Sequence, residues 1–277
     1  MRVFRPLSIV VALLLASAAI AVAAQNGGAR RLPDLAYGPD PAQRLDVYLP
    51  PHANGRIIVM VHGGGWRIGD KAMGRVVDNK LAHWSARGDV FVSIDYRMLP
   101  QAGVAQQAQD VAAALAYVQH HAREWGGDPA NLVLMGHSAG AHLVALLSAN
   151  PSLAAGVQPW RATVSLDSAA LDVPTIMQRR HLPLYDDAFG RDPATWRVLS
   201  PLQQLTAKAP PMLLVCSSER HDSCPAAQSF ADAARRLHVR ADVLPQARTH
   251  GEINADLGQP GAYTAAVDAF IDGLPSR

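Results

Sequence analysis

The chain has 277 residues, of which 49% are hydrophobic and 17% are charged, a balance typical of a globular protein. This composition excludes a disordered or collagen-like chain. Two cysteines are too few for a disulfide-framework miniprotein or a four-cysteine zinc site. Lys and Arg total 25 against 23 Asp and Glu, a net charge of +2. Without Arg2 and Arg5, which lie in the N-terminal segment expected to be removed, the charge is zero, which argues against a nucleic acid or an anionic membrane surface as a partner.

Residues 1–24 have the three parts of a secretory signal peptide. Arg2 and Arg5 supply the positive region, residues 7–21 are almost continuously apolar, and small residues at the end of that run offer a peptidase site. The apolar run is short for a bilayer core of about 30 Å, so we expect cleavage rather than a membrane anchor. The sequence therefore predicts a secreted or periplasmic protein with no stable membrane insertion after signal cleavage.

Short apolar runs alternate with longer helical patterns from Arg44 onward, and we expect a single domain over residues 25–277. Strands are predicted at residues 45–49, 57–61, 90–94, 132–135, 163–166, 212–215 and 241–244. Helices are predicted at residues 104–125, 138–150, 226–237 and 262–274. This alternation indicates an α/β fold, a parallel sheet with helices on both faces. Residues 172–205 hold four prolines and little periodicity, and they predict a small lid inserted over the sheet.

A G-x-S-x-G motif, Gly136 to Gly140, follows a predicted buried strand and opens a predicted helix. A sharp strand-to-helix turn lifts the Ser138 hydroxyl above the sheet, and it needs glycines two residues away on each side. The alternative is a glycine-rich turn in which Ser138 only caps the helix. The strand–turn–helix context favours Ser138 as a nucleophile.

The sequence His62-Gly63-Gly64-Gly65-Trp66 directly follows the predicted strand at residues 57–61. A tetrahedral intermediate needs two or three backbone N–H groups directed at one oxygen, and consecutive glycines allow that geometry. Read alone, three glycines fit a flexible loop equally well. Together with Ser138 they predict an oxyanion hole formed by the amides of Gly64, Gly65 and Ala139, in which His62 has a structural role.

These two motifs, with Asp95-Tyr96-Arg97 before Pro100 and with residues 45–50, resemble the hormone-sensitive-lipase-like and acyl-esterase branch of the α/β-hydrolase superfamily. Kynurenine formamidases and feruloyl esterases share much of the pattern. The resemblance implies a mostly parallel eight-stranded sheet and hydrolysis of a small-molecule carboxylic ester or amide. It implies no cofactor and no metal.

The superfamily order of nucleophile, acid and base places the acid after the predicted strand at 212–215. Similar esterases carry it just before a Val-Pro or Cys-Pro turn, which favours Asp222 over Glu219. Asp222 could instead cap the following helix, and Asp167, at the end of an earlier strand, is a weaker competitor. The base is expected after the last strand, where His250 fits.

The predicted function is a serine esterase with a triad of Ser138, His250 and Asp222, in which Ser138 carries the acyl group of the acyl-enzyme. An amidase, formamidase or small peptidase on the same fold is the first alternative. An inactive α/β-hydrolase that serves as a binding protein is the second.

Cys216 ends a predicted strand and Cys224 lies two residues past Asp222. Export through the signal peptide would bring both to an oxidising compartment, where disulfides persist. We therefore expect a disulfide across the loop that contains the predicted acid, and two unpaired thiols are the alternative.

Overall fold

The computed structural model describes residues 28–275. The predicted signal peptide, residues 1–24, lies outside them. The strands are β1 (Arg30–Ala36), β2 (Arg44–Leu49), β3 (Gly55–Val61), β4 (Val90–Ile94), β5 (Gly127–His137), β6 (Ala162–Leu166), β7 (Met212–Ser217) and β8 (Ala241–Gln246). All eight form one sheet in the order β1-β2-β4-β3-β5-β6-β7-β8, and the six from β4 to β8 run parallel. The predicted eight-stranded, mostly parallel sheet is confirmed.

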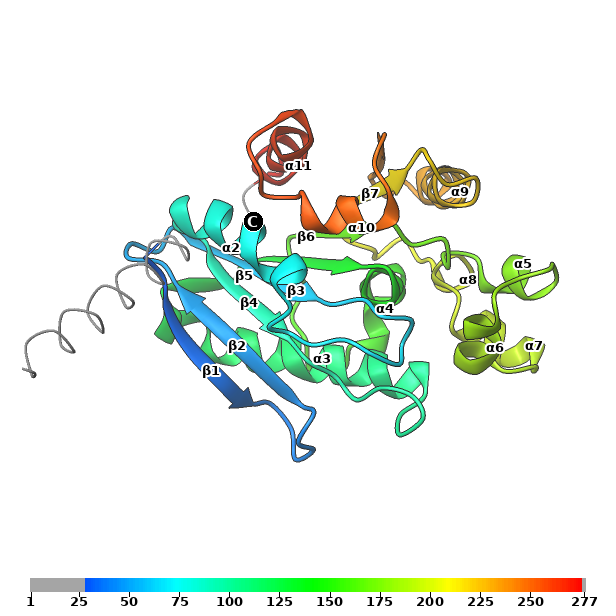
Figure 1. Ribbon diagram of the computed structural model, residues 1–277, viewed down its shortest axis with the longest axis horizontal. Helices are drawn as coiled ribbons and strands as arrows, with labels where there is room; N and C mark the ends of the chain where they lie inside the picture. Colours follow the sequence, from blue (N-terminus) through cyan, green and yellow to red (C-terminus); the bar gives the residue numbers. More distant parts are fainter. Residues whose placement is uncertain (1–27, 276–277) are drawn as a thin grey trace, which may run out of the picture.

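Helices cover both faces of this sheet (Figure 1). The longer ones are α2 (Gly74–Ala86), α3 (Val104–His121), α4 (Ala139–Ala149), α9 (Ser223–Arg236) and α11 (Ala262–Asp272), and α10 (His250–Ala255) is short. Helices α2 and α11 pack on one face, whereas α3, α4 and α9 pack on the other. Strands β3, β4 and β6 are buried along almost their whole length, which explains their continuous apolar sequences.

Several elements were not predicted from the sequence. Strand β1 is mostly exposed at the sheet edge and pairs antiparallel with β2, so it lacks the apolar alternation of a buried strand. Helix α2 and the short α10 were also not predicted as helices. The predicted helix at 104–125 ends at His121, and its last four residues, Ala122–Trp125, form the 3-10 helix η1.

Residues 172–205, the segment predicted as a lid, lie beyond the carboxyl end of β6 and carry four short helices (Figure 1). These are α5 (Val173–Met177), α6 (Pro183–Phe189), α7 (Pro193–Val198) and α8 (Pro201–Gln204), each with a proline in its first turn. Proline suits that position because its missing N–H has no partner there in any helix. The segment therefore has regular structure despite its irregular sequence.

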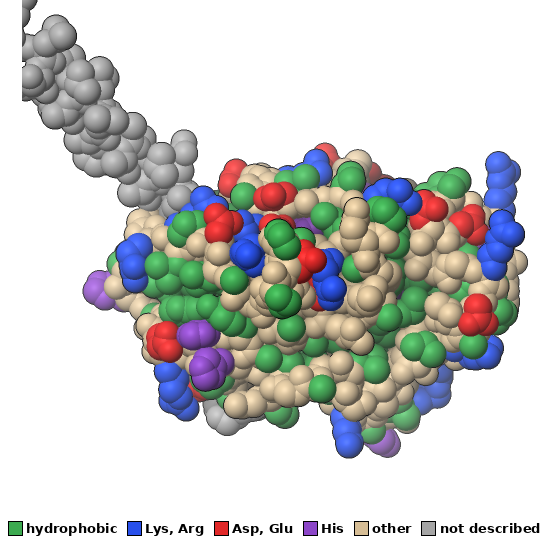
Figure 2. Space-filling model, turned by 90° about the horizontal axis from the view of Figure 1, so that it is seen from below, with side chains coloured by type: hydrophobic (Ala, Val, Ile, Leu, Met, Phe, Trp, Pro, Cys, Tyr) green, Lys and Arg blue, Asp and Glu red, His purple; other side chains and the backbone are tan. Residues whose placement is uncertain are grey.

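The surface opposite α2 and α11 carries lysines, arginines and acids that are interspersed among apolar and uncharged side chains (Figure 2). Neither sign of charge forms an extended area on this face. Among residues 28–275, no helix combines the length and the apolar character that crossing a bilayer requires.

Candidate active site

Ser138 stands on a strained turn between β5 and α4, and its φ of 56° is unusual for a residue with a side chain. The flanking glycines are required by close approach rather than by flexibility. A Cβ at Gly136 would lie 2.5 Å from the carbonyl oxygen of Gly140, and one at Gly140 would lie 2.3 Å from that of Val61. The strand–turn–helix setting predicted for Ser138 is confirmed.

The carboxyl ends of three adjacent parallel strands place the site residues side by side. The amide of Ser138 donates to the carbonyl of Leu166 at 2.9 Å, and the amide of Asp167 donates to that of Val215 at 2.8 Å. Ser138 therefore follows β5 directly opposite the point where Asp167 follows β6. A residue at each of these ends faces the same space above the sheet.

His250 connects Ser138 and Asp167. Its Nε2 lies 2.9 Å from the Ser138 Oγ, and its Nδ1 lies 2.5 Å from the Asp167 Oδ2. Asp167 is fully buried, whereas the imidazole is partly open to solvent. A proton on Nδ1 donated to Asp167 leaves Nε2 free to accept from the serine hydroxyl.

The preference for Asp222 as the partner of His250 is wrong. Asp222 is the N-cap residue of α9, and its carboxylate pairs with the Arg220 Nη2 at 3.0 Å. Glu219 lies in the same loop and is exposed. The loop between β7 and α9 is short, and it directs donors toward Asp167 rather than an acid toward His250. Asp167, the weaker competitor in the sequence, holds the position.

The loop that follows β7 surrounds Asp167 with donors. The Ser217 amide donates to Oδ1 at 2.7 Å, the Ser223 hydroxyl donates to the same oxygen, and the Arg220 Nη1 lies 2.8 Å from Oδ2. Burial acts to raise the pKa of Asp167, but the hydrogen bonds from His250, Ser223 and Ser217, with the charge of Arg220, hold that pKa well below its usual value. Asp167 is therefore a carboxylate at neutral pH.

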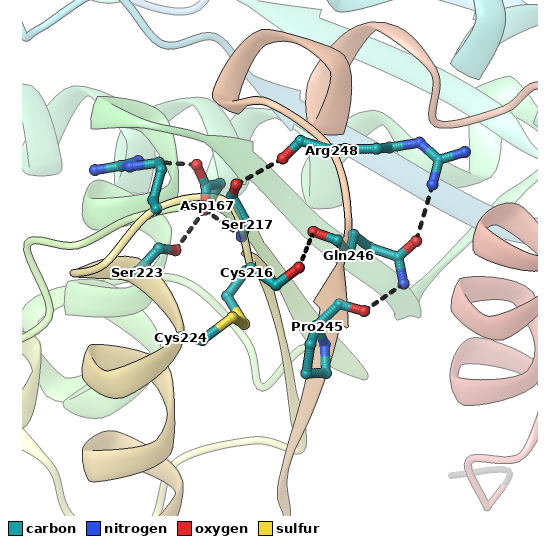
Figure 3. The surroundings of a disulfide bond; sticks show 10 residues. Asp167, Cys216, Ser217, Ser223, Cys224, Pro245, Gln246 and Arg248 are labelled. Carbon is teal, nitrogen blue, oxygen red and sulfur yellow. Dashed lines mark hydrogen bonds and ion pairs between the residues drawn. A yellow bond between two sulfur atoms is a disulfide. The ribbon is translucent and has the colours of Figure 1, made fainter.

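Cys216 and Cys224 form a disulfide whose Cα atoms are 5.0 Å apart, so the expected bridge is present. The two cysteines flank the donors Ser217 and Ser223, both of which point at Asp167 (Figure 3). The Ser217 hydroxyl also donates to the carbonyl of Arg248, two residues before His250. The bridge thus closes the loop that holds the carboxylate, although that carboxylate is not the one the sequence analysis named.

His250 is the first residue of α10, and a capping box fixes the helix at this point. The Thr249 hydroxyl accepts from the Glu252 amide, and the Glu252 carboxylate accepts from the Thr249 amide. His137, the residue before Ser138, has an Nε2 that lies 2.9 Å from the carbonyl oxygen of His250. Burial and the neighbouring His250 lower the pKa of His137 to about 3, so it is a neutral donor.

The glycine-rich loop packs directly against the serine turn. A Cβ at Gly63 would lie 2.8 Å from the Ser138 Cβ, and Gly64 and Gly65 have φ values of 127° and 60°. His62 is buried, stacks on Tyr96 and lies with its Nδ1 2.8 Å from the Gly63 carbonyl oxygen. It therefore has the structural role expected from the sequence.

A cavity of about 340 Å³ opens above Ser138. Two of the three expected oxyanion donors, Gly65 and Ala139, line it, and Gly64 lies in the adjoining turn. Its remaining wall comes from the loops that follow β6 and β7, from His250 and from Trp66 of the glycine-rich loop. The inserted segment adds the apolar side chains of Leu182, Leu184 and Tyr185. A second cavity, of about 780 Å³, shares Ala169, Leu182, Tyr185 and Arg220 with the first.

His142 lies one helical turn after Ser138 and is fully buried. Its Nε2 lies 2.8 Å from the carbonyl oxygen of Leu199, and its Nδ1 lies 3.3 Å from the indole nitrogen of Trp66. Burial lowers the pKa of His142 to about 4. It joins α4 to the glycine-rich loop and to the inserted segment, so it is a packing residue as expected.

Comparison with known proteins points to esterases. A family model described as BD-FAE matches residues 45–165, which include the glycine-rich loop and Ser138 but end before Asp167 and His250. The esterase LipC of Mycobacterium tuberculosis is 32% identical over 260 residues, covering 85% of this chain and 63% of that protein. A probable isoprenylcysteine alpha-carbonyl methylesterase of Arabidopsis thaliana, ICMEL1, is 30% identical over 247 residues, covering 79% of this chain and 50% of that protein.

Solved structures agree on the fold. Esterase 2 of Thermogutta terrifontis with bound propionate superposes with a TM-score of 0.70 at 25% identity, over 90% of this chain and 97% of that one. A truncated carbohydrate esterase from gut microbiota superposes with a TM-score of 0.73 at 19% identity, over 88% of this chain and 95% of that one. The chain spans about half the length of the curated plant relatives it matches. By its sheet and its serine turn the chain has the α/β-hydrolase fold, and in sequence it is similar to esterases of the hormone-sensitive-lipase-like branch of that superfamily.

Proposed function

We propose that this protein hydrolyses carboxylic esters of small molecules by a serine mechanism. The observation that carries the proposal is the continuous path of hydrogen-bond distances from Ser138 through His250 to Asp167. A lone serine on a strained turn serves packing or capping equally well, but a serine aligned with an imidazole and a buried carboxylate is arranged for proton transfer. The esterase relatives agree in reaction type.

In this mechanism each residue of the triad has a defined part. His250 takes the proton from Ser138 as Oγ attacks the ester carbonyl carbon, and it then gives that proton to the departing alcohol. Water next attacks the acyl-enzyme, with His250 again as the base, and releases the acid. Asp167 keeps the Nδ1 proton in place and stabilises the imidazolium that forms at each step.

The developing oxyanion is assigned to the amides of Gly64, Gly65 and Ala139. Ala139 is the first residue of α4, so its amide lies at the positive end of a helix dipole. In comparable sites each such donor contributes about 3 kcal/mol to the transition state. The apolar wall formed by Trp66 and Tyr185 suits an uncharged acyl or alcohol group.

We also propose that the protein is exported. The support comes from two separate observations, the signal-like composition of residues 1–24 and the disulfide between Cys216 and Cys224, a bond that persists in oxidising compartments. Fractionation of producing cells with N-terminal sequencing tests this. We expect a processed chain in the secreted or periplasmic fraction, and an unprocessed chain in the cytosol contradicts it.

The central experiment compares wild type with Ser138→Ala on p-nitrophenyl esters of increasing acyl length and on the matching anilide. We expect ester hydrolysis to fall by about 10⁴-fold or more, because a triad acts as a unit. Ser152→Ala, an exposed serine on a different element, is the matched control and should behave as wild type. Activity of Ser138→Ala within tenfold of wild type rejects the mechanism. Faster cleavage of the anilide favours an amidase, and no turnover of either favours a binding protein.

A further inference from the structure

Arg220 contacts Asp167, His250 and Asp222 on the Nδ1 side of the candidate triad. Its Nη1 lies 2.8 Å from the Asp167 Oδ2 and 3.0 Å from the His250 Nδ1, while its Nη2 lies 3.0 Å from the Asp222 Oδ2. The Arg220 side chain is 27% exposed, and the residue lines both cavities. Neither of the two sequence motifs that identify the site contains it.

The guanidinium and the imidazole approach the same carboxylate oxygen. Nδ1 of His250 must carry its proton to donate to Asp167, and a guanidinium nitrogen is also only a donor. The separation of 3.0 Å between Nη1 and Nδ1 is therefore a close approach of two donors that converge on Oδ2. A fixed positive charge thus lies against the edge of the imidazole that becomes positive during catalysis.

Asp222 holds this arrangement from the other side. It pairs with the second nitrogen of the fork, so Arg220 is held at both ends by carboxylates that come from different elements. A fork fixed in this way has one orientation, which a lysine ammonium cannot reproduce. Asp222 is therefore not the triad acid expected from the sequence, but it has a defined position in the site as the partner of Arg220.

We propose that Arg220 is a positioning residue of the triad: anchored by Asp222, it holds the Asp167 carboxylate against His250 and opposes protonation of the imidazole. The inference rests on the proposed serine mechanism. It predicts that the acid limb of the pH–rate profile moves to higher pH when the charge of Arg220 is removed.

Among the described residues, only Arg220 and Asp167 contact the His250 Nδ1, and the other titratable groups lie on other sides of the imidazole or are engaged elsewhere. From β5, His137 is neutral because its pKa is about 3. From α2, Lys80 is buried with a pKa lowered by desolvation to about 7, and its Nζ contacts the Asn254 carbonyl at the far end of α10. Burial raises the pKa of Tyr185 in the cavity wall, so that phenol is uncharged. Glu252 is engaged by Thr249 in the capping box.

The test follows the pH dependence of two rates: kcat/KM for a p-nitrophenyl ester, and modification of Ser138 by an organophosphonate probe. Arg220→Met and Arg220→Gln remove the charge, and both should raise the midpoint of the acid limb by about one pH unit, because a like charge beside the imidazole is lost. Arg220→Lys retains the charge, so its midpoint should stay near that of wild type while kcat falls. Arg235→Met is the control, since Arg235 is an exposed residue that pairs with Asp232.

A second measurement tests the anchor. Asp222→Asn should lower kcat in the wild-type background and add nothing further to Arg220→Met, because both changes release the same fork. An acid limb that stays in place in Arg220→Met and Arg220→Gln, or full additivity of the Asp222 and Arg220 changes, overturns the inference. If Arg220→Met does not fold, the acid-limb midpoints of Arg220→Gln and Arg220→Lys are compared instead, and equal midpoints overturn the inference. Retention of activity by Ser138→Ala rejects instead the proposed function.

Discussion

At the residue scale, the site depends on backbone geometry that costs free energy. Ser138 and Asp167 end adjacent strands, and both have positive φ, 56° and 55°. Each such residue costs about 1–3 kcal/mol and persists only where its surroundings hold it. Both side chains are consequently directed into the same cavity, where His250 joins them.

The identity of the acid is the sharpest prediction at this scale. Asp167→Asn keeps the shape of the side chain but removes the charge that stabilises the imidazolium and fixes its tautomer. We expect kcat to fall by about 10³–10⁴-fold. Asp222→Asn should have a much smaller effect, because Asp222 acts only through Arg220.

Steady-state kinetics of the two variants side by side check this ranking, and circular dichroism spectra verify that both are folded. If Asp222→Asn caused a larger loss of kcat than Asp167→Asn, the acid would be Asp222, in the loop between β7 and α9.

At the element scale, the Cys216–Cys224 bridge closes the loop that supplies three donors to Asp167. Ser217, Arg220 and Ser223 all lie between the two cysteines, so the position of the carboxylate depends on the conformation of one short loop. The chain-entropy model assigns a disulfide around so small a loop about 2–3 kcal/mol of stability. Its local effect on the site should be larger than its effect on the whole fold.

The double variant Cys216→Ala/Cys224→Ala should therefore lose activity at temperatures well below its unfolding midpoint. Mild reduction of the wild-type protein should reproduce that loss, and the double variant should not respond to reductant. Activity, thiol titration and a circular dichroism melt on the same samples check the order of events. Unfolding that coincides with the loss of activity would indicate a purely global role for the bridge.

At the scale of the whole molecule, two buried neutral histidines connect separate elements. His137 joins β5 to α10, and His142 joins α4 to the glycine-rich loop and the inserted segment. Burial lowers their pKa values to about 3 and about 4, from 6.5. Below pH 6.5 the unfolded chain binds protons that the folded chain does not.

Stability should accordingly be present in full above pH 6.5 and should decline as the pH falls toward 4 and then 3. Urea unfolding at pH 7, 6, 5 and 4 measures the slope. His142→Gln retains a donor and an acceptor but cannot titrate, so the slope between pH 6.5 and 4 should become shallower. A variant slope equal to that of wild type contradicts the assignment of this pH dependence to His142.

Much of the architecture was readable in the sequence because the signals are local. Continuous apolar runs identify strands buried on both faces, and β3, β4 and β6 are such strands. The glycines around Ser138 are dictated by contacts within one turn and its neighbouring strand. His250 was predicted from its place after the last strand.

Which carboxylate contacts His250 is decided by tertiary structure alone. Asp167 lies 83 residues from His250 in the chain, and its neighbours carry no motif. What selects it is the order of the sheet, which places the end of β6 between those of β5 and β7, and the disulfide-closed loop that turns Arg220 toward it. The sequence by itself determined the fold class, the serine turn and the histidine, because these depend on neighbours along the chain. Which carboxylate meets that histidine depends on how strand ends and one loop pack in space.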